Sequence, residues 1–236
     1  MPPGFAATAA LLADPARSAM LHALLGGEAL TAGELARIAG VAPPTASGHL
    51  ARLVGGGLVA VHRQGRHRYH RLASEEVAAA LEALGGLAAL AAAASPRRPW
   101  PHGEAFRTAR LCYDHLAGRV GVGLHARITG AGWLALAPGG WGLTGEGAQR
   151  LAALGLDLEA ARQARRFACD CMDWSERRPH LAGGLGRELA RALLRRGWLR
   201  RTAPRGEGDP FARRRLAPTP EGARALREAF GLDLAA

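Results

Sequence analysis

The stretch that decides the fold is residues 41–72, VAPPTASGHLARLVGGGLVAVHRQGRHRYHRL. Ala46, Leu50 and Leu53 are spaced four and three residues apart, so they share one face of a helix and can pack it onto a core. The opposite face keeps small and polar side chains that fit a nucleic-acid groove. Glycines at positions 55–57 end this helix, because glycine adopts the left-handed conformation of a helix cap at no steric cost.

A basic hairpin is predicted directly after this helix. Residues 58–63 read as a strand, Gln64 and Gly65 as a turn, and residues 66–72 as the returning strand. Its tip carries Arg63, Arg66, His67, Arg68 and Arg71. This density of arginine favours contact with phosphate groups over a merely solvated hairpin.

The residues before this stretch predict three further helices. The first covers residues 5–12, and Asp14 followed by Pro15 is a cap and first-turn pair for the second. Thr31 and Glu34 have the spacing of a capping box, which starts the third helix, and Gly40 ends it. Helix, turn, helix and basic hairpin together predict a winged helix-turn-helix.

The composition indicates which classes of partner and which cellular compartment are consistent with the chain. The chain has 236 residues and a formal net charge of +11, which favours a polyanionic partner. It contains no lysine or asparagine, so part of its arginine content reflects a GC-rich genome. Three cysteines, no secretory signal and no apolar run long enough for a membrane span predict a soluble cytoplasmic protein with reduced thiols.

Several motifs in the first 90 or so residues resemble those of one family. The run S-G-H-L-A-R-L-x-x-x-G-L-V, then R-Q-G-R-x-x-Y-x-x-L, and Asp14-Pro15-x-Arg17 upstream, resemble the DNA-binding domain of the ArsR/SmtB bacterial repressors. The resemblance implies a homodimer on an inverted-repeat operator, with recognition helices in successive major grooves of double-stranded DNA and each wing on the backbone.

The resemblance also implies which residues meet DNA. Base edges would face Thr45, Ser47 and Gly48, and phosphates would contact His49, Arg52, Arg66 and Arg68. The arginine density of the hairpin tip adds Arg63 to the predicted DNA-binding residues. Where relatives often carry serine, glutamine and a second histidine, this chain has Ala42, Pro43 and Gly48. We therefore expect fewer direct contacts between side chains and base edges.

A long helix is predicted over residues 74–90, with Val77, Leu81, Leu84, Leu87 and Leu90 on one stripe. We expect these apolar side chains to pack against the same helix of the partner subunit in a dimer. The alternative is that they pack into the core of their own chain. The alanine, proline and charge of residues 93–105 are typical of a linker. The predicted domains are therefore residues 1–92 and 106–236.

The first domain lacks the family's metal sites. Where relatives place a Glu-Leu-Cys-x-Cys run, this chain has Glu34-Leu35-Ala36-Arg37-Ile38, and residues 74–90 contain no histidine for the alternative site. Any signal must therefore be detected in the second half.

The second half contains an internal duplication. His115-Leu-Ala-Gly-x-x-Gly recurs from His180, and Gly132-Trp-Leu recurs from Gly197, at one offset of 65 (180 − 115 and 197 − 132). We expect two winged-helix-like copies, over about residues 106–158 and 171–234, packed about a pseudo-twofold axis. The expected fold class is mainly α with small β-hairpins (α+β).

Reactive side chains gather around this duplication. The candidate ligands for a soft metal ion or other inducer are Cys112, His115, Cys169, Cys171 and His180. Cys112, Asp114 and His115 are expected within one helical turn. At the offset of 65 (177 − 112), the position equivalent to Cys112 in the second copy is Arg177. This predicts that the thiols were not duplicated with the fold. Structural histidines and inert, buried cysteines are the alternative interpretation.

Three functional classes remain open. The favoured one is a homodimeric repressor released from its operator by an inducer, a soft metal ion or a small organic molecule, bound in the second domain. A redox version would oxidise Cys169 or Cys171, whose one-residue separation strains a direct disulfide. The others are a constitutive DNA-binding protein without ligand and a thiol-dependent enzyme fused to a DNA-binding domain. The enzyme is disfavoured because no G-x-S-x-G, phosphate loop, dinucleotide fingerprint or H-E-x-x-H is present.

Overall fold

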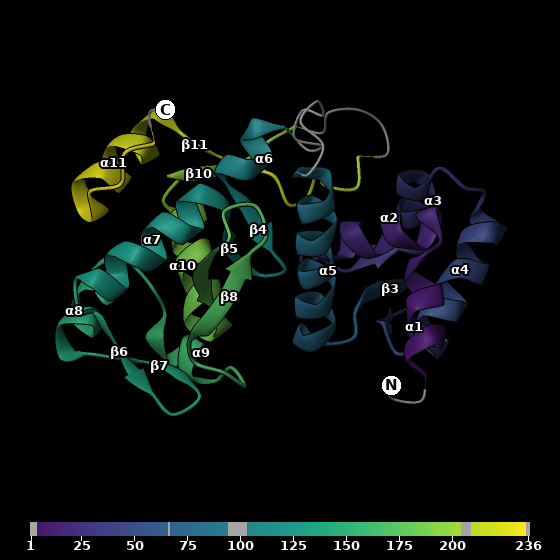
Figure 1. Cartoon of the computed structure of the whole chain (residues 1–236), viewed down its shortest axis with the longest axis horizontal. Coiled ribbons are helices and arrows are strands. Elements are labelled where there is room, and N and C mark those ends of the chain that lie inside the picture. Colours follow the sequence, from purple (N-terminus) through teal and green to yellow (C-terminus); the bar gives the residue numbers. More distant parts are fainter. Residues whose placement is uncertain (1–3, 66, 94–102, 204–208, 235–236) are drawn as a thin grey trace. The chain divides into compact units, whose positions relative to one another are not determined.

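The computed structural model describes residues 4–65, 67–93, 103–203 and 209–234, which form two compact units. The first comprises Met1–Leu81 with Ala203–Arg214, and the second comprises Glu82–Thr202 with Arg215–Ala236. Most of the predicted linker lies outside the described residues. Figure 1 labels most of the elements.

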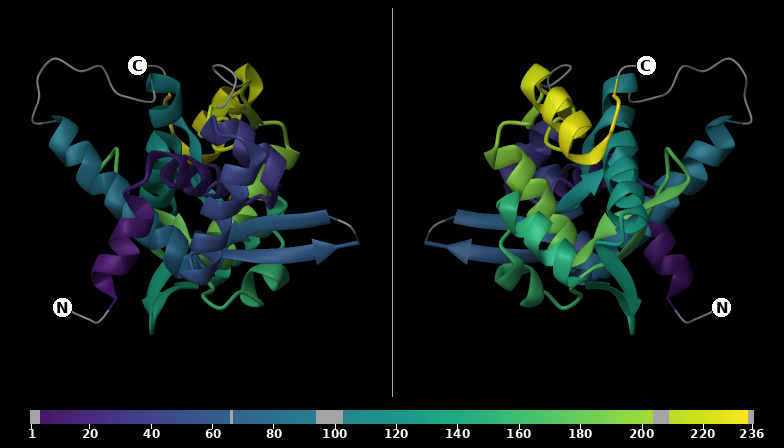
Figure 2. Two further views of the ribbon diagram at one scale, coloured as in Figure 1. Left: turned by 90° about the vertical axis from the view of Figure 1, so that its right-hand side faces the viewer. Right: turned by 90° about the vertical axis from the view of Figure 1, so that its left-hand side faces the viewer.

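The first unit is a winged helix-turn-helix, as its sequence predicts. Its elements are α1 (Phe5–Leu12), α2 (Pro15–Leu24), β1 (Leu30–Thr31), α3 (Ala32–Ala39), α4 (Pro43–Gly55), β2 (Val59–Gln64), β3 (His67–Leu72) and the start of α5 (Glu75–Ala93). The strands form an antiparallel sheet in the order β1-β3-β2. Figure 2 shows the β2–β3 hairpin extending beyond the helices of the first unit.

Local signals explain where these helices begin and end. The Asp14 side chain accepts a hydrogen bond from the backbone N–H of Arg17 at 2.9 Å and caps α2. Thr31 and Glu34 form both halves of the predicted capping box at the start of α3. Gly40, with φ of 65°, ends α3 in the left-handed conformation that favours glycine.

A segment of the predicted second domain packs instead into the first unit. Arg213 forms ion pairs with Glu28 and, at 2.9 Å, with Glu34. The Phe211 ring lies against His22, with ring centroids 5.0 Å apart. These contacts come from the segment between the strands Leu199–Arg201 and Leu216–Pro218, and no feature of the sequence predicted that this segment joins the first unit.

The second unit repeats one order of elements: hairpin, helix, hairpin, helix. After α6 (Glu104–Thr108), the first copy has β4 (Arg110–Cys112), β5 (His115–Ala117), α7 (Gly118–Gly130), β6 (Leu134–Ala137), β7 (Gly140–Leu143) and α8 (Gly145–Ala153). After α9 (Leu158–Arg162), the second has β8 (Cys169–Asp173), β9 (Arg178–Ala182), α10 (Gly183–Arg195), β10 (Leu199–Arg201), β11 (Leu216–Pro218) and α11 (Pro220–Phe230). The likeness of each copy to a winged helix stays a prediction.

Equivalent close contacts recur in the two copies. Thr144 caps α8 through the N–H of Gly147, and Thr219 caps α11 through the N–H of Gly222. A Cβ atom on Gly147 would collide with the carbonyl oxygen of Trp133, and one on Gly222 would collide with the equivalent oxygen of the second copy. Only glycine lets these helices approach the preceding strands so closely.

Candidate functional site

The recognition helix α4 presents one polar face. Ala46, Leu50 and Leu53 are buried, as their spacing predicts. Thr45, Ser47, Gly48 and Arg52 are exposed. The predicted base-reading residues therefore lie on the surface of the helix that the fold leaves open to a groove.

His49 differs from its neighbours because it faces the protein. Its Nδ1 atom lies 3.4 Å from Nη1 of Arg17 and 3.8 Å from a carboxylate oxygen of Asp14. Arg17 in turn donates to the carbonyl oxygens of Leu11 at 2.7 Å and Ala10 at 2.8 Å. This network joins α1, α2 and α4, so a structural role accounts for His49, and its contact with phosphate stays a prediction.

The wing places two cations opposite one another. Arg63 on β2 and Arg68 on β3 are directly paired in the antiparallel register, and both are exposed. Like charges in this position destabilise a hairpin unless an anion lies between or beside them. Their pairing suits a phosphate backbone. Arg66 lies outside the described residues.

The reactive residues of the second unit lie on two hairpins, which corrects the prediction of a helical turn at Cys112. Cys112 ends β4 and His115 begins β5, and the two are directly paired across the tight turn at Tyr113 and Asp114. Tyr113 has a φ of 60°, which a helix does not allow. Three-residue strands show too little alternation for sequence periodicity to reveal them.

The second hairpin carries the same pair. Cys171 on β8 is directly opposite His180 on β9. The equivalent of Cys112 is therefore Cys171, and the assignment of Arg177 was wrong. The cysteines are 59 residues apart (171 − 112) and the histidines 65 (180 − 115), because the second hairpin is six residues longer (65 − 59). A fixed offset could not find this equivalence, so both the thiol and the imidazole were duplicated.

The fold brings these two pairs together. One ligand atom from each of Cys112, His115, Cys171 and His180 lies within 4.8 Å of the others. The two sulfur atoms are 3.9 Å apart, and the two imidazole rings are stacked with centroids 5.1 Å apart. We call these four residues the Cys/His cluster. Cys169, the remaining candidate, lies outside it, opposite Ala182 in the β8–β9 ladder.

Comparisons with known proteins identify the kind of protein that carries this cluster. A family model described as a helix-turn-helix domain matches residues 12–62. Over 200 residues, the chain is 41% identical to the uncharacterized HTH-type transcriptional regulator YdfF of Bacillus subtilis (strain 168), covering 84% of this chain and 88% of that one. The chain belongs to the HTH-type transcriptional regulators.

Two solved structures are also similar to parts of this regulator. One is the homodimeric winged helix-turn-helix DNA-binding domain of Mb0332 from Mycobacterium bovis, at 26% identity and a TM-score of 0.35, covering 42% of this chain and 97% of that one. The other is the transcriptional repressor BigR from Xylella fastidiosa, at 29% identity and a TM-score of 0.31, covering 35% and 83%.

The regulator is a DNA-binding protein of the winged-helix type, and the motifs of its first unit resemble those of the ArsR/SmtB family. Within its described residues, no helix is both long and apolar enough to cross a membrane.

The donor atoms of the regulator's Cys/His cluster fit a tetrahedral metal ion. Two sulfurs bound to zinc at about 2.3 Å lie about 3.8 Å apart at the tetrahedral angle, close to the 3.9 Å between Cys112 and Cys171. Nε2 of His115 and both ring nitrogens of His180 are buried, without a hydrogen-bond partner among the described residues. Nδ1 of His180 lies 3.8 Å from a carboxylate oxygen of Asp173, an ion-pair contact that is too long for a hydrogen bond. Buried nitrogens without hydrogen bonds are costly, and an ion bound to the cluster would satisfy those that face it.

A carboxylate also orients one imidazole as metal sites require. Nδ1 of His115 lies 3.2 Å from a carboxylate oxygen of Asp114, which leaves Nε2 to face the cluster. Ligating histidines commonly use their second nitrogen in this way. Sequence reasoning placed Asp114 beside the candidates but did not assign it this function.

Burial and neighbouring charged groups determine which side chains of the cluster carry a proton. The hydrogen bond with Cys171 and burial raise the pKa of the Cys112 thiol, and the charge of Glu82 raises it further. Burial and the nearby His115 lower the pKa of His180, which keeps that imidazole neutral. Burial opposes the charge of His115, but Cys112 and Asp114 outweigh it and raise the pKa of that imidazole to about 10. An entering ion must therefore displace protons from sulfur and from His115, whereas His180 is ready to donate its lone pair.

A buried ion pair joins the two copies beside the cluster, in addition to the hydrophobic core that they share. Asp173, at the end of β8, accepts a hydrogen bond from Arg110 at 2.9 Å and another from the N–H of Gly118 at 2.6 Å. Both donors belong to the first copy. The Arg110 and Asp173 side chains are completely buried, and Arg110 also stacks on the Trp174 ring at 4.7 Å.

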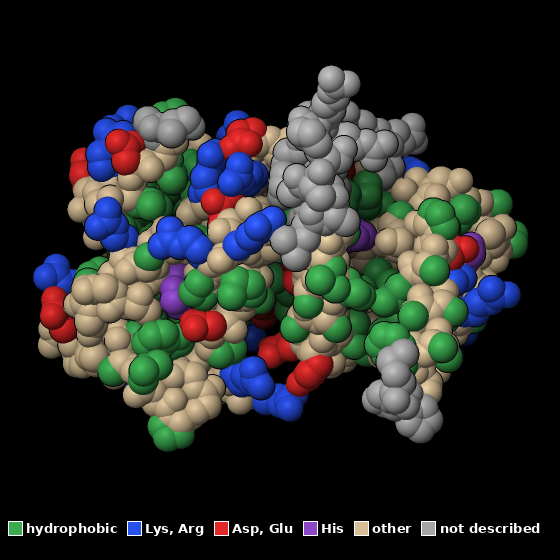
Figure 3. Space-filling model, in the orientation of Figure 1, with side chains coloured by type: hydrophobic (Ala, Val, Ile, Leu, Met, Phe, Trp, Pro, Cys, Tyr) green, Lys and Arg blue, Asp and Glu red, His purple; other side chains and the backbone are tan. Residues whose placement is uncertain are grey.

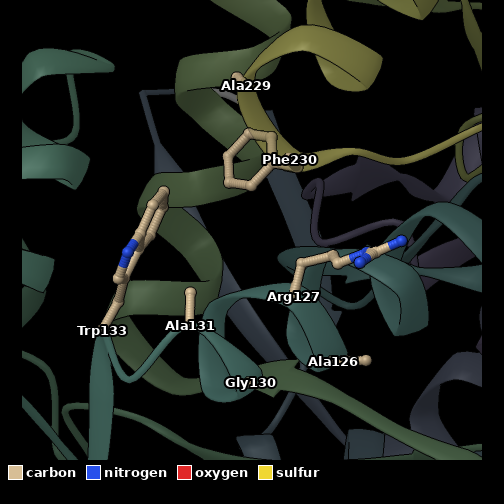
Figure 4. Close-up of a pocket in the computed structure, with 7 residues that line it drawn as sticks. All are labelled: Ala126, Arg127, Gly130, Ala131, Trp133, Ala229 and Phe230. Atoms are coloured by element: carbon tan, nitrogen blue, oxygen red, sulfur yellow. The ribbon is translucent and has the colours of Figure 1, made fainter.

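The regulator also has a surface pocket of about 400 Å³ between α7 and α11. Figure 4 shows the rings of Trp133 and Phe230 on two of its sides, with Ala131 and Arg127 nearby. Two aromatic rings and one cation therefore line this depression.

Proposed function

We propose that this regulator is a homodimeric repressor that leaves an inverted-repeat operator when a soft or borderline divalent metal ion binds the Cys/His cluster. The observation that carries the proposal is the cluster itself, in which duplicated cysteine–histidine pairs supply two thiols and two imidazoles to one buried point. Two sulfur and two nitrogen donors suit zinc, cadmium or a similar ion.

Exposed apolar side chains support the dimer. Phe5 on α1 is 54% exposed, and Leu84 and Leu87 on α5 are 45% and 62% exposed. Figure 3 shows hydrophobic side chains along the visible surface of α5. Large apolar residues in a row on a helix favour burial against a symmetry mate.

Helix α5 offers a route from the cluster to the DNA-binding unit. It begins within the first unit and continues into the second, which starts at Glu82. Glu82 is only 4% exposed, and its carboxylate charge acts on the Cys112 thiol. An ion that converts Cys112 to a bound thiolate changes the electrostatic environment of Glu82 and so biases the position of α5.

The test is DNA binding by the reduced protein to its own upstream region, titrated separately with zinc, cadmium, lead and copper, and with trivalent arsenite as a comparison. We expect one ion to weaken binding by tenfold or more, which corresponds to a coupling of about 1.4 kcal/mol. The Cys112→Ser/Cys171→Ser variant should bind DNA as tightly as the parent does without metal, and the ion should not weaken this binding. Cys169→Ser is the matched control and should respond normally.

Unchanged binding with every ion would refute the metal-responsive repressor. In that case the α7–α11 pocket makes a small organic inducer the second candidate, tested by substituting Trp133→Ala in a screen of aromatic ligands. Constitutive DNA binding would be the remaining explanation.

A further inference from the structure

The two cysteines of the Cys/His cluster are close enough to react with each other. Their sulfur atoms are 3.9 Å apart, and a disulfide needs them about 2.05 Å apart. Cys112 lies at the end of β4 and Cys171 on β8, and these strands belong to separate ladders. No shared ladder hydrogen bond must therefore break for the sulfurs to approach.

The two thiols differ in access. Cys112 is 2% exposed, whereas Cys171 is partly exposed. A small oxidant from solvent therefore meets Cys171 first, and Cys112 is protected from it. This is the arrangement of a peroxidatic thiol with a resolving thiol behind it.

We propose that Cys112 and Cys171 form a reversible disulfide when a hydroperoxide reaches the cluster. The Cys171 sulfur attacks the peroxide, so that an S–O bond forms, the O–O bond breaks, and water or an alcohol leaves. The Cys112 sulfur then attacks the Cys171 sulfur, an S–S bond forms, and the hydroxyl leaves as water with the Cys112 proton. Two electrons pass from the thiols to the hydroperoxide.

The disulfide and the metal ion exclude one another. Oxidation removes both thiolates of the four-ligand cluster and leaves two imidazoles, which bind a divalent ion far more weakly. This regulatory consequence rests on the proposed metal response, whereas formation of the disulfide does not. The same four side chains would then respond both to a metal ion and to an oxidant.

The first experiment treats the metal-free full-length chain with hydrogen peroxide and maps cysteine peptides under non-reducing conditions. We expect one intramolecular Cys112–Cys171 linkage, reversed by dithiothreitol, and the same linkage in the Cys169→Ser variant. Cys112→Ser should stop at a sulfenic acid on Cys171, trapped by dimedone. A linkage that includes Cys169, or no intramolecular linkage, would overturn the proposal.

The second experiment repeats the oxidation after loading with zinc, and measures zinc release with a chelating dye. Protection of at least tenfold in rate, with zinc released as the disulfide forms, is expected. A disulfide without any zinc binding would refute the metal proposal and leave this inference standing. Zinc binding with cysteines that stay reduced in the metal-free chain would refute this inference alone.

Discussion

The Asp173→Asn substitution should destabilise the second unit far more than an ordinary surface change. Asp173 is completely buried, and it is the partner of the equally buried Arg110. It also accepts hydrogen bonds from the N–H groups of Gly118, Ser175 and Glu176, at 2.6, 2.9 and 3.0 Å. Asparagine keeps the shape and removes the charge.

The expected loss is about 3–5 kcal/mol, because removal of one partner leaves an uncompensated buried charge on the other. Asp157→Asn is the matched control, since Asp157 is an exposed cap of α9. It should cost about 1 kcal/mol or less, because asparagine is itself a good cap. Replacing both members, Arg110→Met with Asp173→Asn, should cost no more than the single change, because no charge is left unpaired.

The assay is equilibrium denaturation in guanidinium chloride followed by tryptophan fluorescence. All five tryptophans follow residue 99, and the four described ones lie in the second unit, so the signal reports that unit. A loss for Asp173→Asn equal to that of Asp157→Asn would refute the reasoning.

The same pair predicts a dependence on pH. Burial opposes ionisation of Asp173, but the Arg110 guanidinium and the hydrogen bonds of Ser175 and Gly118 outweigh it and hold the pKa of this carboxyl well below its usual range. A lowered folded pKa contributes stability above the unfolded value of about 4 and loses it as the pH falls further. The difference between the parent and Asp173→Asn should therefore shrink in acid.

Three further outcomes are expected. Arg63→Ala with Arg68→Ala should weaken binding to all duplexes about equally and reduce the salt slope by about 2, measured by fluorescence anisotropy at several salt concentrations; an unchanged slope would contradict the wing assignment. Gly147→Ala and Gly222→Ala should each lower the Tm by the equivalent of about 1–3 kcal/mol, whereas Gly145→Ala, whose added Cβ meets nothing within 4 Å, should not. Zinc affinity, measured by chelator competition, should rise from about pH 6 to about pH 8, because the ion displaces thiol protons; a constant affinity would argue against thiolate ligands.

The sequence predicted the first unit well because its signals are local. The spacing of Ala46, Leu50 and Leu53, the capping box at Thr31 and the left-handed Gly40 each act within a few residues. The inward position of His49 was not predictable, because it depends on Arg17, a partner 32 residues away in the chain.

In the second unit, the candidate ligands were predicted but their arrangement was not. Four of the five fall in one cluster, yet the helical turn expected at Cys112 is a hairpin. The constant offset of 65 aligned the histidines and misaligned the cysteines, because the insertion lies between Cys171 and His180. Pairing across two strands, rather than distance along the chain, decides which residues are equivalent.

The position of Asp173 bears on whether the proposed metal ion would act as a signal or as a structural element. Asp173 binds Arg110 and Gly118 of the first copy, and residues of both copies share one hydrophobic core, so the hairpins that carry the cysteines stay joined without an ion. A preformed cluster does not need metal to fold, unlike a zinc finger, so the free energy of binding can change the affinity for DNA. Removal of metal should then leave the far-ultraviolet circular dichroism of the parent unchanged. In Asp173→Asn, zinc should raise the Tm more than in the parent, because the ion would replace part of the lost attachment between the hairpins. Equal shifts would mean that this buried pair does not help to preform the cluster.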